Sequence, residues 1–108
     1  MSEILGAFEQ AVLVGVVHLG EDAYGRAVLR ESEERLGRDV SAGAIYATLD
    51  RLEAQGLLTS RLDDGTLARG GRARRYYKIS ALGIAALNES RTALKGIWSG
   101  VVWPMRRA

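Results

Sequence analysis

The stretch SAGAIYATLDRLEAQGLLTSRLDDGTLARGGRARRYYK, residues 41–78, decides the fold. Its first part has apolar residues at spacings of four and three, which fall on one face of a helix: Ile45, Leu49 and Leu52. Ser41 is suited to be the N-cap, and Gly56 stands where a left-handed residue commonly ends a helix. We therefore predict a helix over residues 42–55.

The opposite face of this predicted helix carries mostly small residues: Gly43, Tyr46, Ala47, Asp50, Arg51 and Ala54. Small residues let a backbone approach its partner closely, and the major groove of DNA, about 12 Å wide, admits a helix. The face therefore fits a recognition helix. Two alternatives stay open: Tyr46 contacts DNA or is half-buried packing, and Arg51 contacts phosphate or pairs with Asp50 or Glu53.

Beyond Gly56 the period changes to alternation, which predicts two short antiparallel strands. The first contains Leu58, Ser60 and Leu62, and the second contains Tyr77 and Ile79. Because side chains alternate between the two faces of a strand, one of Tyr76 and Tyr77 should lie in the core and the other should be exposed.

The loop predicted between the strands, residues 63–74, becomes basic after its first half. No acidic residue follows Asp64 before the end of the second strand, and the basic residues are Arg69, Arg72, Arg74, Arg75 and Lys78. Gly70 and Gly71 give the loop freedom to follow a curved partner. This composition suits phosphate oxygens or a minor groove, and the alternative is a mobile hairpin tip that touches nothing.

The composition indicates one small domain whose basic character is local. The chain has 108 residues, 47% of them hydrophobic and 26% charged, with a formal net charge of only +2. It contains no cysteine and no apparent secretory signal, so we expect a cytoplasmic protein without disulfides. His18 is the only histidine, and we interpret it as structural, since neither a metal site nor a nucleophile with a base is apparent. An enzyme is not expected, and no cofactor is predicted.

The remaining sequence predicts three more helices. Apolar spacing predicts one helix over residues 7–19, closed by Gly20, and another over residues 23–36, capped by Asp22 and ended by Gly37. With the helix at 42–55, the second of these forms a helix-turn-helix. A fourth helix should begin after Ser80 and end near Val102, because Pro104 disfavours helical geometry before it.

This last helix carries more apolar surface than a small core needs: Ile84, Leu87, Leu94, Trp98, Val101 and Met105. We therefore divide the chain into a DNA-binding domain, residues 1–79, and a dimerisation helix with its tail, residues 80–108. The predicted dimer contacts are Phe8, Ile84, Leu87, Leu94, Trp98 and Val101. Trp98 and Trp103 either anchor the dimer or line a pocket that stacks a planar aromatic small molecule.

The whole pattern resembles the PadR family of winged-helix transcriptional regulators. The similarity rests on FEQAVLVGV, EDAYG, GAIYATLDRLEAQGLL, RGGRARRYYKIS and ALGIAAL, and the chain is similar to the short members with a single C-terminal dimerisation helix. The resemblance implies DNA contacts from Tyr24, Ser41, Gly43, Tyr46, Ala47, Thr48, Arg51, Arg69, Gly70, Gly71, Arg72, Arg74 and Arg75. Ser32 departs from the family, which usually has an apolar residue there.

The predicted fold is mainly α with a small β-hairpin wing (α+β), a winged helix-turn-helix with a long C-terminal helix. The predicted function is a homodimeric repressor that binds a pseudo-palindromic operator in double-stranded DNA and is released by a small molecule or stress signal. The alternative is a winged-helix protein-interaction module, because a fold does not fix a function. The concentrated arginines of the wing favour DNA.

Overall fold

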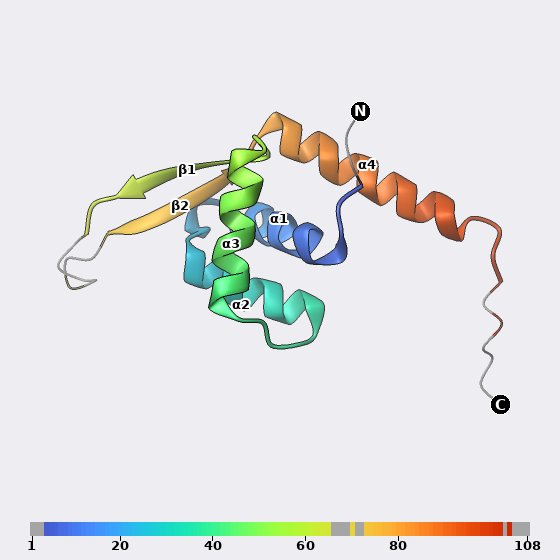
Figure 1. The fold of residues 1–108 in the computed structure, drawn as a ribbon, viewed down its shortest axis with the longest axis horizontal. Coiled ribbons are helices and arrows are strands. Elements are labelled where there is room, and N and C mark those ends of the chain that lie inside the picture. Colours follow the sequence, from blue (N-terminus) through green and yellow to red (C-terminus); the bar gives the residue numbers. More distant parts are fainter. Residues whose placement is uncertain (1–3, 66–69, 71–72, 103, 105–108) are drawn as a thin grey trace.

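The computed structural model describes residues 4–65, 70, 73–102 and 104 of the chain. Its elements, in order, are α1 (Ala7–Leu19), η1 (Gly20–Asp22), α2 (Gly25–Leu36), α3 (Ala42–Ala54), β1 (Leu58–Asp63), β2 (Arg74–Ile79) and α4 (Ala81–Trp98) (Figure 1). A mainly helical chain with one antiparallel hairpin confirms the predicted fold class. Among the described helices, none has the length and hydropathy needed to cross a membrane.

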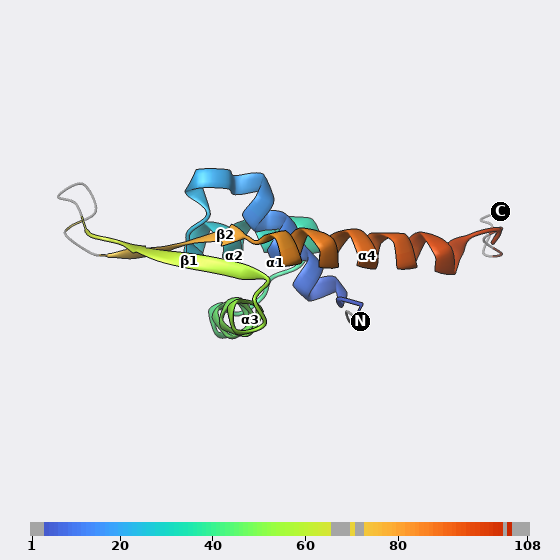
Figure 2. The same cartoon turned by 90° about the horizontal axis from the view of Figure 1, so that it is seen from above.

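The core lies where α1, α2 and α3 meet the base of the hairpin. Viewed from above, α3 lies on one side of the hairpin and the end of α1 with η1 on the other (Figure 2). The largest fully buried hydrophobic side chains come from all three helices and from β1: Val12, Leu13, Val28, Ile45, Leu49, Leu52 and Leu58. The apolar face predicted for α3 is therefore confirmed as its core face.

The first helix has the bounds that the sequence predicts, and Gly20 closes it with a φ of 59°. The start of α2 differs from the prediction. Asp22 ends a 3-10 turn instead of capping a helix, and the N-cap is Tyr24, whose side chain makes no capping hydrogen bond. Ala23 and Tyr24, predicted as the first two helical residues, therefore precede the helix, because Asp22 is as well suited to a turn as to an N-cap. The predicted end of α2 at Gly37 is confirmed, since Gly37 is left-handed with a φ of 68°.

Both predicted serine caps are present. The Ser41 hydroxyl accepts the Ala44 N–H at 3.0 Å, and the Ser80 hydroxyl accepts the Gly83 N–H at the same distance. The hairpin pairs Leu58 with Ile79 at its base and Asp63 with Arg74 at its far end. Each strand thus includes one residue that we predicted to be in the loop, Asp63 in β1 and Arg74 in β2.

The last helix has a packed half and an exposed half. Near the hairpin, Gly83, Ala86 and Ser90 are buried, and the Ser90 hydroxyl accepts the Leu5 N–H at 2.8 Å. The distal half of α4, residues 91–98, extends away from the body (Figure 1). The predicted end near Val102 is wrong, because Gly100 adopts a φ of 76° and the helix stops at Trp98 before Pro104 has any effect.

Two single residues also differ from expectation. His18 is exposed, and its Nε2 atom lies 4.0 Å from Oε2 of Glu31, a carboxylate that follows only in the next helix. Ser32 is fully buried between α1 and α2, and its hydroxyl has no hydrogen-bond partner among the described residues. Within the described part of the chain, no cluster of three potential metal-binding side chains occurs.

Candidate nucleic-acid interface

The outward face of α3 is open, as a recognition helix requires. Ser41, Gly43 and Ala47 are exposed, and a side chain at Gly43 would meet no atom within 4 Å. Tyr46 is 43% exposed, which leaves one side of its ring free. Thr48 does not belong to this face: it is only 3% exposed, so its place in the predicted DNA contacts is wrong. Thr48 lies between Ile45 and Leu52, one turn away on either side, and both of these are core residues.

The buried side of Tyr46 lies against the start of α2. A Cβ built on Gly25 would collide with the Tyr46 ring and would lie 2.8 Å from its hydroxyl oxygen. Glycine at position 25 therefore lets α3 approach α2 so closely that Tyr46 covers the first turn of that helix. Both residues line a hollow of about 270 Å³, here called the α2 hollow.

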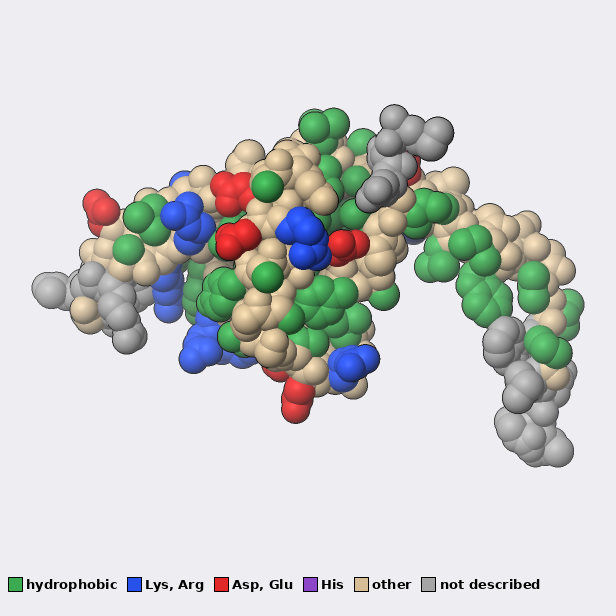
Figure 3. Space-filling model, in the orientation of Figure 1, with side chains coloured by type: hydrophobic (Ala, Val, Ile, Leu, Met, Phe, Trp, Pro, Cys, Tyr) green, Lys and Arg blue, Asp and Glu red, His purple; other side chains and the backbone are tan. Residues whose placement is uncertain are grey.

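The α2 hollow combines cations and hydroxyls with the start of a helix. It is lined by Tyr24, Gly25, Arg26, Tyr46, Ala73, Arg74, Arg75 and Tyr77. The first turn of a helix has N–H groups without intrahelical partners, and the helix dipole makes that end positive. In Figure 3, Lys and Arg side chains gather below the hairpin and beside α3. Such an arrangement suits a phosphate group.

Arg74 is held in place by aromatic rings. Its guanidinium carbon lies 3.8 Å from the centre of the Tyr24 ring, within the range of a cation–π contact. Hydrogen bonding to Tyr76 raises the pKa of the Arg74 guanidinium. Arg75 points to the other face of the strand, where its Nη1 donates to the Ser60 hydroxyl at 3.0 Å. The two arginines are thus presented on opposite faces of β2.

The two tyrosines of β2 lie on opposite faces as predicted, but Tyr76 is half-buried instead of exposed. Tyr77 is 6% exposed and belongs to the core, and burial raises the pKa of its hydroxyl. Tyr76 is half-buried on the other face, beside Tyr24.

Arg51 is turned toward α1. Its Nη2 lies 3.3 Å from Oε2 of Glu9 and 3.4 Å from the hydroxyl oxygen of Thr48. The partner is therefore neither Asp50 nor Glu53, the two acids adjacent in sequence. An exposed ion pair of this kind is weak, so a phosphate could replace Glu9.

Part of the predicted wing lies outside the described residues, namely Arg69, Gly71 and Arg72. Gly70 is described, and its φ of 70° fits a tight turn that favours glycine. Sequence reasoning missed Gly25 and Arg26. Their position in the first turn of α2 would have indicated them, had the start of that helix been placed correctly.

A family model described as the transcriptional regulator PadR-like family matches residues 13–89. The chain belongs to this family. The match covers the second half of α1, the helix-turn-helix, the hairpin and the packed half of α4.

Individual relatives agree with this assignment. The transcriptional regulator Rv3488 of Mycobacterium tuberculosis is 44% identical over 80 residues, which cover 72% of this chain and 69% of that protein. A PadR family regulator from Eggerthella lenta has a similar structure, with 31% identity, a TM-score of 0.68 and coverage of 87% and 80% of the two chains. RosR of H. salinarum gives 27% identity, a TM-score of 0.63 and coverage of 91% and 81%.

Membership of this family indicates the function that the described geometry serves. PadR-like proteins are DNA-binding transcriptional regulators, so the chain is a transcriptional regulator of the winged-helix type. Family membership also confirms the resemblance that the five sequence segments indicate.

Proposed function

We propose that this PadR-like protein is a homodimeric repressor that grips DNA with α3, the start of α2 and the wing. The observation that carries the proposal is the α2 hollow, where Arg26 and Arg74 flank the first turn of α2 beside Tyr46 of α3. In this arrangement α3 enters the major groove, while Tyr24, Arg26 and Arg74 bind the phosphates beside it. Tyr46 and Ala47 would then face base edges, with Ser41 and Gly43 nearest the backbone.

The second copy would be held by α4. Exposed apolar side chains lie along α4 and the residues after it, and their exposed fractions range from 50% to 85%: Ile84, Leu94, Ile97, Trp98, Val101 and Val102. A groove between the N-terminal segment, α1, the end of α2 and α4 offers a matching apolar surface, lined among others by Ile4, Leu5, Val14, Leu36, Leu94 and Ile97. We propose that the distal half of α4 of one protomer packs into this groove of the other, as an isologous pair.

Two predicted dimer contacts have a share in the protomer's own core. Phe8 and Leu87 pack against the core cluster and are only partly exposed. They would border the dimer contact, with Leu94 and Trp98 at its centre. This proposal keeps the division into a DNA-binding part, residues 1–79, and a dimerisation part, residues 80–108.

Release by a signal is proposed at the same contact. Trp98 is half-exposed on the distal half of α4, so in a dimer its indole could stack a planar aromatic molecule and alter the distance between the two α3 helices. Trp103, the other residue predicted for this pocket, lies outside the described residues. The dimer anchor remains the primary role proposed for Trp98.

The experiment for the proposed function is selection of bound duplexes by the purified protein, followed by sequencing. We expect enrichment of a twofold-symmetric site whose half-sites lie one helical turn apart, about 34 Å centre to centre. Transcription from a promoter overlapping that site should fall when the protein is added. Recovery of random sequences alone would contradict sequence-specific repression and favour the protein-interaction alternative.

A further inference from the structure

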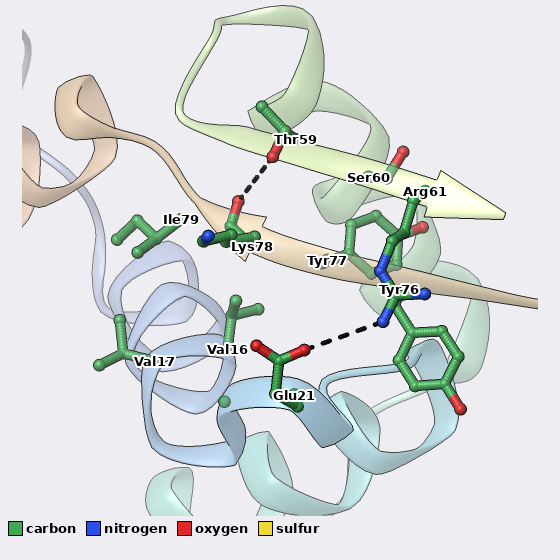
Figure 4. Close-up of a pocket in the computed structure, with 11 residues that line it drawn as sticks. Val16, Val17, Glu21, Thr59, Ser60, Arg61, Tyr76, Tyr77, Lys78 and Ile79 are labelled. Carbon is green, nitrogen blue, oxygen red and sulfur yellow. Dashed lines mark hydrogen bonds and ion pairs between the residues drawn. The ribbon is translucent and has the colours of Figure 1, made fainter. Parts of the chain in front are cut away.

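Arg61 lies on the face of the hairpin that is turned away from α3. Its neighbour Ser60 points to α3, because the Ser60 hydroxyl donates to Oε2 of Glu53 at 2.7 Å. Successive side chains alternate between faces, so Arg61 shares its face with Tyr76, the residue opposite it in β2. Figure 4 shows Arg61 and Tyr76 beside η1, where an Arg61 Nη2 atom lies 3.9 Å from Oε1 of Glu21.

From Arg61 a row of stacked side chains leads to the α2 hollow. The Arg61 guanidinium carbon lies 4.8 Å from the centre of the Tyr76 ring. The Tyr76 ring lies 5.8 Å from the Tyr24 ring, centre to centre, at an interplanar angle of 59°. Arg74 then covers the Tyr24 ring at 3.8 Å. We call these four residues, Arg61, Tyr76, Tyr24 and Arg74, the Arg–Tyr ladder.

The two ends of the ladder lie in different surroundings. Arg61 and Tyr76 line a groove of about 310 Å³ between the hairpin and the end of α1, whereas Tyr24 and Arg74 line the α2 hollow. The pair of tyrosine rings therefore stands between the two. Arg61 itself is not among the residues that line the α2 hollow.

The backbone joins the same two elements at the same place. Tyr24 and Tyr76 form an isolated antiparallel bridge, and the Tyr77 N–H donates to the Ala23 carbonyl oxygen at 2.8 Å. A two-stranded hairpin has little stability of its own, so its direction depends on contacts such as these. The ladder adds side-chain contacts beside this bridge, between the same two elements.

We propose that Arg61 is a positioning residue for DNA binding. Through Tyr76 and Tyr24 it holds Arg74 where a phosphate meets it, without touching DNA itself. This inference rests on the proposed function, in which Tyr24 and Arg74 contact phosphates. It assigns to Arg61 a role that differs from that of the other wing arginines, which neutralise phosphate charge directly.

The test compares Arg61→Ala, Arg74→Ala and Lys78→Ala in binding to a labelled random-sequence duplex over a series of salt concentrations. Lys78 is the control, because it is an exposed cation two residues from Tyr76 on the same face and outside the ladder. We expect Arg61→Ala to weaken binding about two- to fivefold, the scale of one exposed cation–π contact, with an unchanged salt slope. Arg74→Ala should make the slope shallower by about 0.9.

Three results would overturn the positioning role. A salt slope shallower by about 0.9 in Arg61→Ala would place Arg61 on a phosphate. An equal loss in Arg61→Ala and Lys78→Ala would reduce the effect to overall charge. Unchanged affinity in Arg61→Ala would remove the residue from DNA binding altogether.

A second measurement needs no DNA. Amide hydrogen exchange at Tyr77 reports on the bond to the Ala23 carbonyl, and it should quicken in Arg61→Ala and Tyr76→Leu but not in Lys78→Ala. Exchange that is the same in all variants would overturn the ladder even if DNA binding were normal. A wild-type chain that fails to bind the duplex would instead overturn the proposed function, while the exchange rates still decide the ladder.

Discussion

The α2 hollow and the distal half of α4 are both open surfaces, but the protomer prepares them differently. Around the hollow, Tyr46 and Arg74 already make contacts within the protomer: Tyr46 packs against Gly25, and Arg74 stacks on the Tyr24 ring. Along the distal half of α4, three large apolar side chains, Leu94, Ile97 and Trp98, are each at least 50% exposed. The first surface is therefore ready for a charged partner, whereas the second requires an apolar one.

This difference indicates where a substitution should act. Around the hollow, a change should alter DNA binding and leave the oligomeric state as it is, because the side chains are held within one protomer. On the distal half of α4, a change should alter the oligomeric state first and DNA binding only as a consequence.

The largest effect is expected from Leu94→Asp combined with Trp98→Asp. A carboxylate in the dimer contact would be desolvated without a partner, so the chain should become monomeric or unfold. Loss of two-site binding should lower operator affinity on the order of 10²–10⁴-fold. Light scattering measures the mass, and Asn88→Asp with Thr92→Asp, on the exposed polar side of α4, is the control. A double mutant that stays dimeric would remove the distal half from the interface.

Gly25→Ala should break the other surface. The added Cβ forces the Tyr46 ring away from α2, and overpacking of this kind costs about 1–3 kcal/mol. If that strain is relieved by displacing Tyr46, DNA affinity should fall roughly tenfold while the dimer persists. Fluorescence anisotropy with the selected duplex measures the loss. In a chain that already carries Tyr46→Ala, Gly25→Ala should cause no further loss of DNA affinity. If the losses from the two changes simply add, the proposed collision between Gly25→Ala and the Tyr46 ring is contradicted.

Arg26→Ala should weaken binding to all duplexes by a similar factor. Each lost phosphate contact makes the slope of log K against log salt shallower by about 0.9, without changing preference among sequences. The matched control is Arg30→Ala, an exposed arginine one turn further along α2 that does not line the hollow. Equal salt slopes in both variants would exclude Arg26 from the interface.

A pair of buried serines should change the stability of the protomer, and neither of them lines the α2 hollow. Ser32→Ala removes a hydroxyl without a described partner, so it should raise the free energy of unfolding by about 1 kcal/mol. Ser90→Ala leaves the Leu5 N–H without its acceptor and should lower that free energy by about 1–3 kcal/mol. Denaturant unfolding measures both. A destabilised Ser32→Ala would mean that this hydroxyl has a partner after all.

Local signals in the sequence predict most of the fold. Ser41 and Ser80 cap their helices, and Gly20 and Gly37 end theirs, because these residues act on backbone groups a few positions away. The predicted start of α2 is wrong because Asp22 is as well suited to a turn as to a helix N-cap. The predicted end of α4 is wrong because the helix is interrupted at Gly100, before Pro104.

The candidate site is less accessible to such reasoning. The ladder depends on the meeting of Tyr24 with Tyr76, and the support of Tyr46 depends on Gly25, contacts between residues far apart in the chain. Neither pairing leaves a periodic signal. Thr48 lies at the boundary between the core and outward faces of α3, where helical spacing alone does not decide its burial.

The central claim, that two copies present α3 to one face of DNA, can be measured directly by the distance between spin labels. The chain has no cysteine, so Ala44→Cys and Ala54→Cys place single labels at exposed positions near the two ends of α3. With the selected duplex bound, dipolar spectroscopy should give two distances whose average is close to about 34 Å, one turn of DNA. The absence of a dipolar signal, or distances that do not average to one turn, would contradict the claim.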